Sequence, residues 1–223
     1  LIVLLKVVVT FALVLVAVML MIWFERKVHA DMSNRLGPNR AGPFGLFQTL
    51  ADGTKFFFKE DLVPDRADRR VFAIAPFLAM IPAFVTFSVV AVCLKIKEEK
   101  QGAVKIFGNH TYLQLADPPI GVLLVLAMSS IAIYGVMLAG WSSGSKYPLL
   151  GSVRATAQMV SYEAALGLAV VSVVLLSGSL STHDIVMAQA GEGFFGIIPG
   201  WNLIVAGVVP FVIFVIAATA ELN

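Results

Sequence analysis

The sequence predicts an all-α integral membrane protein with five transmembrane helices and a long inner loop that contains an amphipathic interfacial helix. Hydrophobic residues make up 59% of the 223 residues and charged residues 13%, where soluble domains have roughly 45–50% and 25%. The mean hydropathy is +0.90. The apolar residues also fall into runs of about 20, the length that crosses a hydrocarbon core of about 30 Å. We therefore expect a single membrane domain over residues 1–223.

Each apolar run is predicted to be one helix, because only helices satisfy their own backbone hydrogen bonds inside a bilayer. The first run is too long for the apolar part of a signal peptide, and no basic segment or cleavage site precedes it. We expect it to be a permanent span. The last run is close to the lower limit of length. The five expected spans are 1–24, 71–94, 120–141, 153–176 and 203–220.

The basic residues predict the orientation of these spans. With the N-terminus outside, the loop 25–70 and the turn 142–154 lie inside and hold 11 of the 16 Lys and Arg residues. Inner loops of membrane proteins carry such an excess. The sequence therefore predicts a multi-pass membrane protein with an outer N-terminus and an inner loop 25–70.

Composition also excludes several kinds of function. A net charge of +2 gives no reason to expect a nucleic-acid partner. The single cysteine, Cys93, lies in an apolar run, and one thiolate cannot hold an iron–sulfur cluster. The three histidines lie in separate loops without metal-ligand spacing. We expect this chain to bind no metal or redox cofactor, so any electrons must be carried by another component.

The inner loop contains a predicted amphipathic helix over about 43–59. Phe47, Leu50, Thr54 and Phe57/Phe58 share one helical face, and a set of polar residues shares the other. A helix of this length, about 26 Å, is too polar to span and suits the membrane interface. Two interpretations stay open, a simple surface anchor and a gate that holds an apolar molecule at the membrane surface.

Glu163 is the most informative residue, because it stands about 15 Å inside its span with no basic residue between Ala155 and Leu176. Inserting an ionised side chain at a helix centre costs about 2.5–3.5 kcal/mol. Arg154 lies about 2.5 turns away on the opposite face, so a partner must come from another helix or from water. A protonated glutamic acid that only joins two helices is the structural alternative to a proton-carrying role.

Two further carboxylates stand at the inner ends of spans. Glu25 follows the first span and Glu221 ends the fifth. Glu25 alone is typical of a solvated charge cluster at a membrane boundary. Together with Glu163 and the amphipathic helix, the two carboxylates indicate a proton route that meets a site for an apolar ligand.

Three segments resemble a known family. They are "ERKVHADMSNRLGPNRAGPFGLFQTLADGTKFFFKED", "AGWSSGSKYPLLGSVRATAQMVSYE" and the terminal "AELN". They are similar to the H-type membrane subunit of bacterial respiratory complex I, the proton-translocating NADH:quinone oxidoreductase, clipped after the fifth span. The resemblance implies a non-redox membrane subunit of that translocase, placed in the bacterial plasma (inner) membrane with the loop 25–70 in the cytoplasm. Quinone would be its substrate, and FMN and iron–sulfur clusters would belong to partner subunits. Its partners would be soluble-arm subunits at the loop 25–70, neighbouring small membrane subunits and lipids.

The resemblance also implies roles for individual residues. Glu25 and Arg26 match the wall of the quinone chamber, Asp52 matches a chamber acid, and Arg35 matches the segment that faces the soluble arm. A quinone tail would pass the phenylalanines 56–58 while its headgroup meets the charged residues. The expected quinone-chamber residues are Glu25, Arg26, Arg35, Asp52, Phe56, Phe57 and Phe58, and the expected proton path contains Arg154, Tyr162, Glu163 and Glu221.

Two alternatives stay open beside this resemblance. The homologous membrane subunit of an energy-converting hydrogenase or a related complex would share the carboxylates without using quinone. A freestanding proton-coupled transporter belongs to a different class, but such transporters usually show paired repeats with broken helices. The sequence shows no internal repeat.

Overall fold

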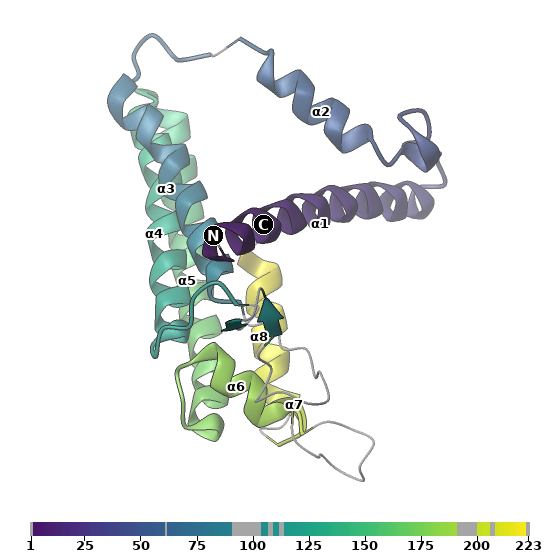
Figure 1. The fold of residues 1–223 in the computed structure, drawn as a ribbon. Helices are drawn as coiled ribbons and strands as arrows, with labels where there is room; N and C mark the ends of the chain where they lie inside the picture. The colour runs from purple at the N-terminus through teal and green to yellow at the C-terminus, as the bar shows by residue number, and fades with distance from the viewer. Residues whose placement is uncertain are drawn as a thin grey trace. The chain divides into compact units, whose positions relative to one another are not determined.

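The computed structural model describes residues 2–60, 62–90, 104–106, 109–111, 114–190, 200–205 and 208–221. The predicted all-α membrane fold is confirmed, because four of the described helices are long and apolar enough to cross a membrane. One short hairpin, not expected from the sequence, adds two strands, β1 (Val104–Ile106) and β2 (Asn109–Thr111), which pair antiparallel. The chain divides into two units, Leu1–Leu62 and Val63–Asn223, and Figure 1 shows the elements of both.

The first unit contains the long helix α1 (Ile2–Met32), the short 3-10 helix η1 (Pro43–Gly45) and helix α2 (Gln48–Phe57). With 31 residues, α1 is about 46 Å long. It therefore exceeds the hydrocarbon core of about 30 Å by roughly ten residues. The expected span ended at residue 24, but the charged residues that follow are good helix formers, so the helix continues beyond the apolar run.

The turn between α1 and η1 folds back on α1. A β-carbon on Gly37 would lie 3.3 Å from the β-carbon of the buried Ala30. Gly45 has φ +78°, and a β-carbon there would lie 2.1 Å from the carbonyl oxygen of Pro38. Glycine is thus required at 45 both by the backbone conformation and by the close approach of the chain.

The second unit is built around three long helices, α3 (Arg69–Ser88), α4 (Gly121–Ser142) and α5 (Lys146–Ser177). Helix α4 packs against α3 and against α5, and the three run side by side in Figure 1. Asp68 caps α3 by accepting hydrogen bonds from the backbone N–H groups of Arg70 and Val71. Gly178, with φ +67°, ends α5 in the left-handed conformation.

Three shorter helices complete the second unit: α6 (Thr182–Gln189), α7 (Asn202–Val205) and α8 (Val208–Glu221). Helix α8 packs against α5. Of the expected fifth span, 203–220, the structure describes residues 203–205 in α7 and 208–220 in α8. The apolar part of α8, Val208–Ala220, is shorter than the four long helices.

A buried polar cluster ties the end of α3 to the start of α6. The Gln114 side-chain amide donates to the Val89 carbonyl (3.0 Å) and to the Thr182 hydroxyl (2.9 Å). Thr182 in turn donates to the same Val89 carbonyl at 2.8 Å. Gln114 is 5% exposed and Val89 is 1% exposed, so these bonds satisfy polar groups that water does not reach.

Few large apolar side chains are buried in the described part of this chain. The buried apolar residues are mostly small and include Ala30, Ala75, Ala169 and Ala217, and at most 11% of the apolar window of any long helix is buried. Helices in a bilayer associate through close approach of small residues and leave their large apolar side chains to lipid or to other subunits. The exposed surface therefore suits a membrane protein.

Candidate functional site

Glu163 lies on α5 and accepts hydrogen bonds from two hydroxyl groups on α4. Ser130 Oγ donates to Glu163 Oε1 at 2.8 Å, and Ser129 Oγ donates to the same oxygen. Glu163 is half-buried. The partner on another helix that the sequence required is thus a pair of serines. They were not predicted from the sequence, although two adjacent serines in the middle of an apolar run are a usable signal.

The depth of this contact follows from α4. With 22 residues, α4 is about 33 Å long, close to the thickness of the hydrocarbon core. Ser129 and Ser130 stand at the ninth and tenth positions of that helix, near its midpoint. Glu163 therefore meets its hydroxyl partners near the middle of the membrane.

Helices α4 and α5 approach each other closely near the end of α4 that the sequence predicts to face the cytoplasm. Gly140 of α4 and Ser152 of α5 are both buried, and a β-carbon on Gly140 would lie 2.1 Å from Ser152 Oγ. The pairs Gly140–Ser152 and Ser130–Glu163 agree with one antiparallel register of the two helices. The absence of a side chain at Gly140 permits this approach.

Thr156 presents a buried hydroxyl on the same face of α5 as Ser152 and Glu163, since seven residues are close to two helical turns. Its Oγ1 has no hydrogen-bond partner among the residues that the structure describes. Buried hydroxyls usually find a partner, in many proteins an ordered water. The inward half of this face is thus polar at three levels.

The other predicted proton-path residues lie apart from the serine contact. Tyr162 is half-buried next to Glu163 in sequence, about 100° round the helix. Arg154 is exposed, nine residues before Glu163. Glu221 is the last residue of α8, and its side chain lies outside the described part of the chain. Their membership of a proton path remains a prediction.

In the first unit, Arg26 and Asp52 form an ion pair between α1 and α2. Arg26 Nη1 lies 2.6 Å from Asp52 Oδ2, and the Gln48 amide donates to Asp52 Oδ1 at 3.2 Å. The Arg26 guanidinium, followed by the Gln48 amide, holds the pKa of the Asp52 carboxyl below its ordinary value of 3.8. Asp52 is therefore ionised at neutral pH.

Further contacts attach the turn and α2 to the same face of α1. Trp23 Nε1 donates to the Phe44 carbonyl at 2.9 Å, and Lys27 Nζ donates to Asn39 Oδ1 at 2.5 Å. Phe44 has φ +56°, an uncommon conformation for a bulky residue, and the tryptophan contact holds its carbonyl. Arg35 is exposed on the turn.

The apolar face of α2 points away from α1. Asp52, which pairs with Arg26 of α1, lies about 140–160° round α2 from Leu50 and Phe57. Thr49, which also contacts α1, lies between these two sides. Leu50 is 53% exposed and Phe57 is 90% exposed. Phe56 and Phe58 are also largely exposed. A helix with its polar side attached to the protein and its phenylalanines uncovered suits contact with lipid or with an apolar ligand.

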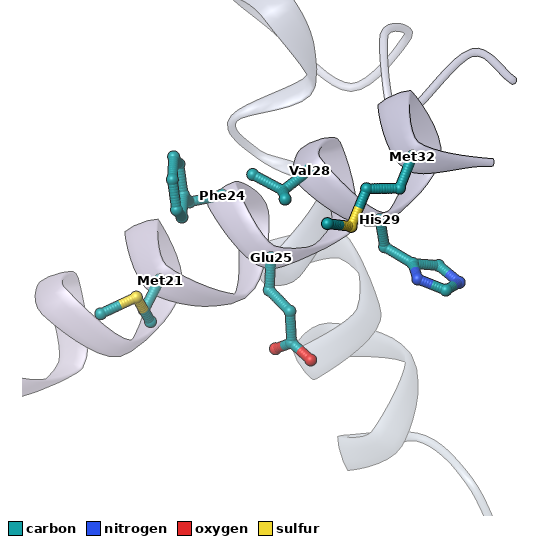
Figure 2. A pocket seen from close by; sticks show the side chains of 6 residues that line it. All are labelled: Met21, Phe24, Glu25, Val28, His29 and Met32. Carbon is teal, nitrogen blue, oxygen red and sulfur yellow. The ribbon is translucent and has the colours of Figure 1, made fainter. Parts of the chain in front are cut away.

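Glu25 does not join this group. It lines a shallow open hollow on α1 with five neighbours, and Figure 2 shows the six side chains along one stretch of the helix. At 100° per residue, this side of α1 is opposite the one that carries Trp23, Arg26 and Ala30. The structure thus brings Arg26 and Asp52 together and separates Glu25 from them. The hollow is lined by Met21, Phe24, Glu25, Val28, His29 and Met32.

No group of three or more potential metal ligands is present among the described residues. Cys93 lies outside them, and the side chain of His110 is not described. The structure thus offers one candidate site in each unit: a surface ion pair beside an uncovered apolar helix face in the first, and an intramembrane carboxylate with its hydroxyl partners in the second.

Comparison with known proteins assigns these features to a family. A family model described as NADH dehydrogenase matches residues 5–223. The H subunit of NADH-quinone oxidoreductase from Frankia alni is 48% identical over 90% of this chain and 43% of its own length. The H subunit from Streptomyces avermitilis is 46% identical over 98% of this chain and 45% of its own. The H 2 subunit from Geobacter metallireducens is 43% identical over 98% and 62%. The chain thus spans about half the length of these relatives.

Proposed function

The chain belongs to the NADH dehydrogenase family, and from that premise we propose that it is part of the membrane subunit of a proton-pumping NADH:quinone oxidoreductase. In this role it forms the quinone chamber and begins the carboxylate path that couples quinone reduction to proton translocation. The resemblance read from the sequence motifs and the family match agree on this family. The complex would lie in the bacterial inner membrane, with the loop 25–70 in the cytoplasm.

The observation that carries this proposal is Glu163 at mid-membrane depth with two serine hydroxyls directed at one of its oxygens. An ionisable group in this position is costly to insert and is usually retained for transport or proton transfer. A carboxyl group accepts hydrogen bonds when ionised and donates one when protonated, and a serine hydroxyl can partner it in either role. Glu163 therefore has the properties of a proton relay.

The ion pair on the inner surface suits the quinone end of the same function. Quinone reduction places negative charge on the headgroup oxygens, and a positioned cation such as Arg26 stabilises it. Because the pKa of Asp52 is lowered, this carboxylate is a poor proton donor near pH 7. We assign it the task of orienting Arg26. Arg35 and Glu25 would act elsewhere on the chamber wall.

The redox groups of the reaction are assigned to partner subunits. Iron–sulfur clusters are held by several thiolates, and this chain has one cysteine. FMN and the clusters would deliver electrons from soluble-arm subunits bound at the loop 25–70. This chain would contribute binding, charge and proton transfer to the quinone, which takes two electrons and two protons to become quinol.

The relatives' names favour the quinone enzyme over a subunit of an energy-converting hydrogenase. A freestanding transporter is disfavoured by the same matches. NADH:quinone activity that co-purifies with the full-length subunit would support the first assignment, and proton uptake by the isolated subunit in vesicles would support the last.

Glu163→Gln tests the proposed relay in the full-length subunit. The amide keeps the shape of the side chain and removes the titratable group, so the complex should assemble while proton pumping and quinone-coupled turnover fall. Pumping is measured by dye quenching in inverted membrane vesicles, and turnover by NADH oxidation with quinone. An assembled Glu163→Gln complex with unchanged protons per electron would refute the relay.

A further inference from the structure

Ser129 and Ser130 each lie within hydrogen-bond distance of two acceptors. Ser129 Oγ is 2.9 Å from the Leu126 carbonyl oxygen, and Ser130 Oγ is 3.0 Å from that same oxygen. Both hydroxyls also reach Glu163 Oε1, Ser130 at 2.8 Å. One carbonyl and one carboxylate oxygen thus compete for the same two donors.

A serine hydroxyl has a single hydrogen and two lone pairs. It can donate to Leu126 or to Glu163 at a given moment, and it can accept from a third group while it does so. The position of its hydrogen follows from rotation about the C–O bond, which moves no heavier atom. The observed positions are therefore compatible with two hydrogen-bond patterns.

We propose that Ser129, Ser130 and the Leu126 carbonyl form a hydroxyl switch that keeps Glu163 hydrogen-bonded in both of its protonation states. When Glu163 is ionised, both hydroxyls donate to Oε1. When a proton binds at Oε1, the new O–H donates to Ser130 Oγ, whose own hydrogen turns to the Leu126 carbonyl. The proton is the only particle gained, and its departure reverses the rotation. The switch rests on the proposed relay, for which the two serines are positioning residues.

The two hydroxyls are suited to partner Glu163 because the charged residues of the neighbouring helices lie far along those helices from the level of the serine contact. Helix α4 has no charged residue at all. The others carry theirs toward their ends or well before Glu163. In a poorly solvated interior, a carboxyl group that loses its hydrogen bonds in one protonation state is held in the other. The ionisable residues on these helices are Arg69 and Arg70 of α3, Tyr134 of α4, Lys146, Tyr147, Arg154 and Tyr162 of α5, His183 and Asp184 of α6, and Glu221 of α8.

The experiment compares two double variants in the assembled complex. Ser129→Ala with Ser130→Ala removes both hydroxyls, and Ser129→Thr with Ser130→Thr retains them, since threonine can also bond a carbonyl in the preceding turn. Losing hydrogen bonds to a charged group changes an equilibrium by about tenfold or more. We therefore expect quinone-coupled turnover to fall about tenfold in the alanine pair and to recover in the threonine pair.

An infrared difference spectrum gives a readout that a purely structural role would not move. The carboxyl band that disappears in Glu163→Gln should shift in frequency in the alanine pair and stay in place in the threonine pair. Ser172→Ala is the matched control, because its hydroxyl donates to the Ala169 carbonyl on α5, at 2.6 Å, and not to Glu163. That control should leave both band and turnover unchanged.

The outcomes separate the switch from the relay on which it rests. If Glu163→Gln impairs pumping while the alanine pair keeps its turnover and its band, the switch is refuted and the relay stands. If the threonine pair loses as much as the alanine pair in assembled complex, packing explains the effect and the switch is refuted. Should the alanine pair fail to assemble, the single variant Ser130→Ala must shift the band, and an unshifted band refutes the switch. Unchanged pumping in the Glu163→Gln complex would refute the proposed relay itself.

Discussion

Replacement of Gly140 by alanine should loosen the α4–α5 pair. A β-carbon there would lie 2.1 Å from Ser152 Oγ and 2.6 Å from the Pro148 carbonyl oxygen. Ordinary contact begins at 3.4 Å, so the helices would have to separate by about 1.3 Å at this level. Overpacking of this kind costs about 1–3 kcal/mol, whereas glycine to alanine in a helix gains at most about 1 kcal/mol. Because the overlap with Ser152 is large, the cost of the clash should exceed this gain, with a net loss of up to about 2 kcal/mol.

The assay is thermal inactivation of the purified complex, with quinone-coupled turnover measured before heating. Gly167→Ala is the matched control, because a β-carbon at 167 would meet no described atom within 4 Å. We expect Gly140→Ala to lose activity at a lower temperature than the control. A separation carried along the helices would also stretch the 2.8 Å bond between Ser130 and Glu163 and lower turnover. Equal stability and equal turnover for the two variants would refute the reasoning.

Two further predictions concern the inner surface. Asp52→Asn should slow quinone reduction but spare NADH oxidation by a hydrophilic artificial acceptor, because the amide no longer orients Arg26; equal loss of both activities would indicate failed assembly instead. Since the pKa of Asp52 is lowered from 3.8, the contribution of the ion pair to quinone reduction should be fully present above pH 3.8 and be lost only as the pH falls through the lowered value. The ratio of wild-type to Asp52→Asn rates should therefore not vary with pH through the neutral range. Phe57→Glu should raise the apparent KM for long-tailed quinones more than for short-tailed ones, since only a long tail must pass α2, and it is measured with a tail-length series. A uniform loss for both tail lengths would favour a plain surface anchor.

The helices could be predicted well from length and composition, because a bilayer demands a fixed number of apolar residues. The expected span 120–141 and helix α4 (Gly121–Ser142) differ by one residue at each end. The expected ends of a span agree less well with the observed helix ends where polar residues extend the helix beyond its apolar run. Helix α5 begins at Lys146, seven residues before the expected span, with Pro148 in its first turn. Proline is tolerated there because that turn has no internal partner for its N–H groups.

The side-chain partners could not be predicted, because they depend on which helices are neighbours. The need for a partner of Glu163 followed from its depth, but its source, Ser129 and Ser130, required the antiparallel contact of α4 and α5. Glu25 and Arg26, which the sequence analysis places in one chamber, leave α1 about 100° apart. That separation was available from helical geometry, and the contact of Arg26 with Asp52 makes it visible.

Helix α1 carries Glu25 and Arg26 on different sides, so its backbone lies between the two charged groups. Glu25 and Arg26 leave α1 about 100° apart, so a molecule bound beside the Arg26–Asp52 pair does not face Glu25 directly. The backbone of α1 gives a proton no route through the helix, since its N–H and C=O groups are bonded to one another along the axis. A proton that passes between the two acids must therefore travel round α1 and not through it.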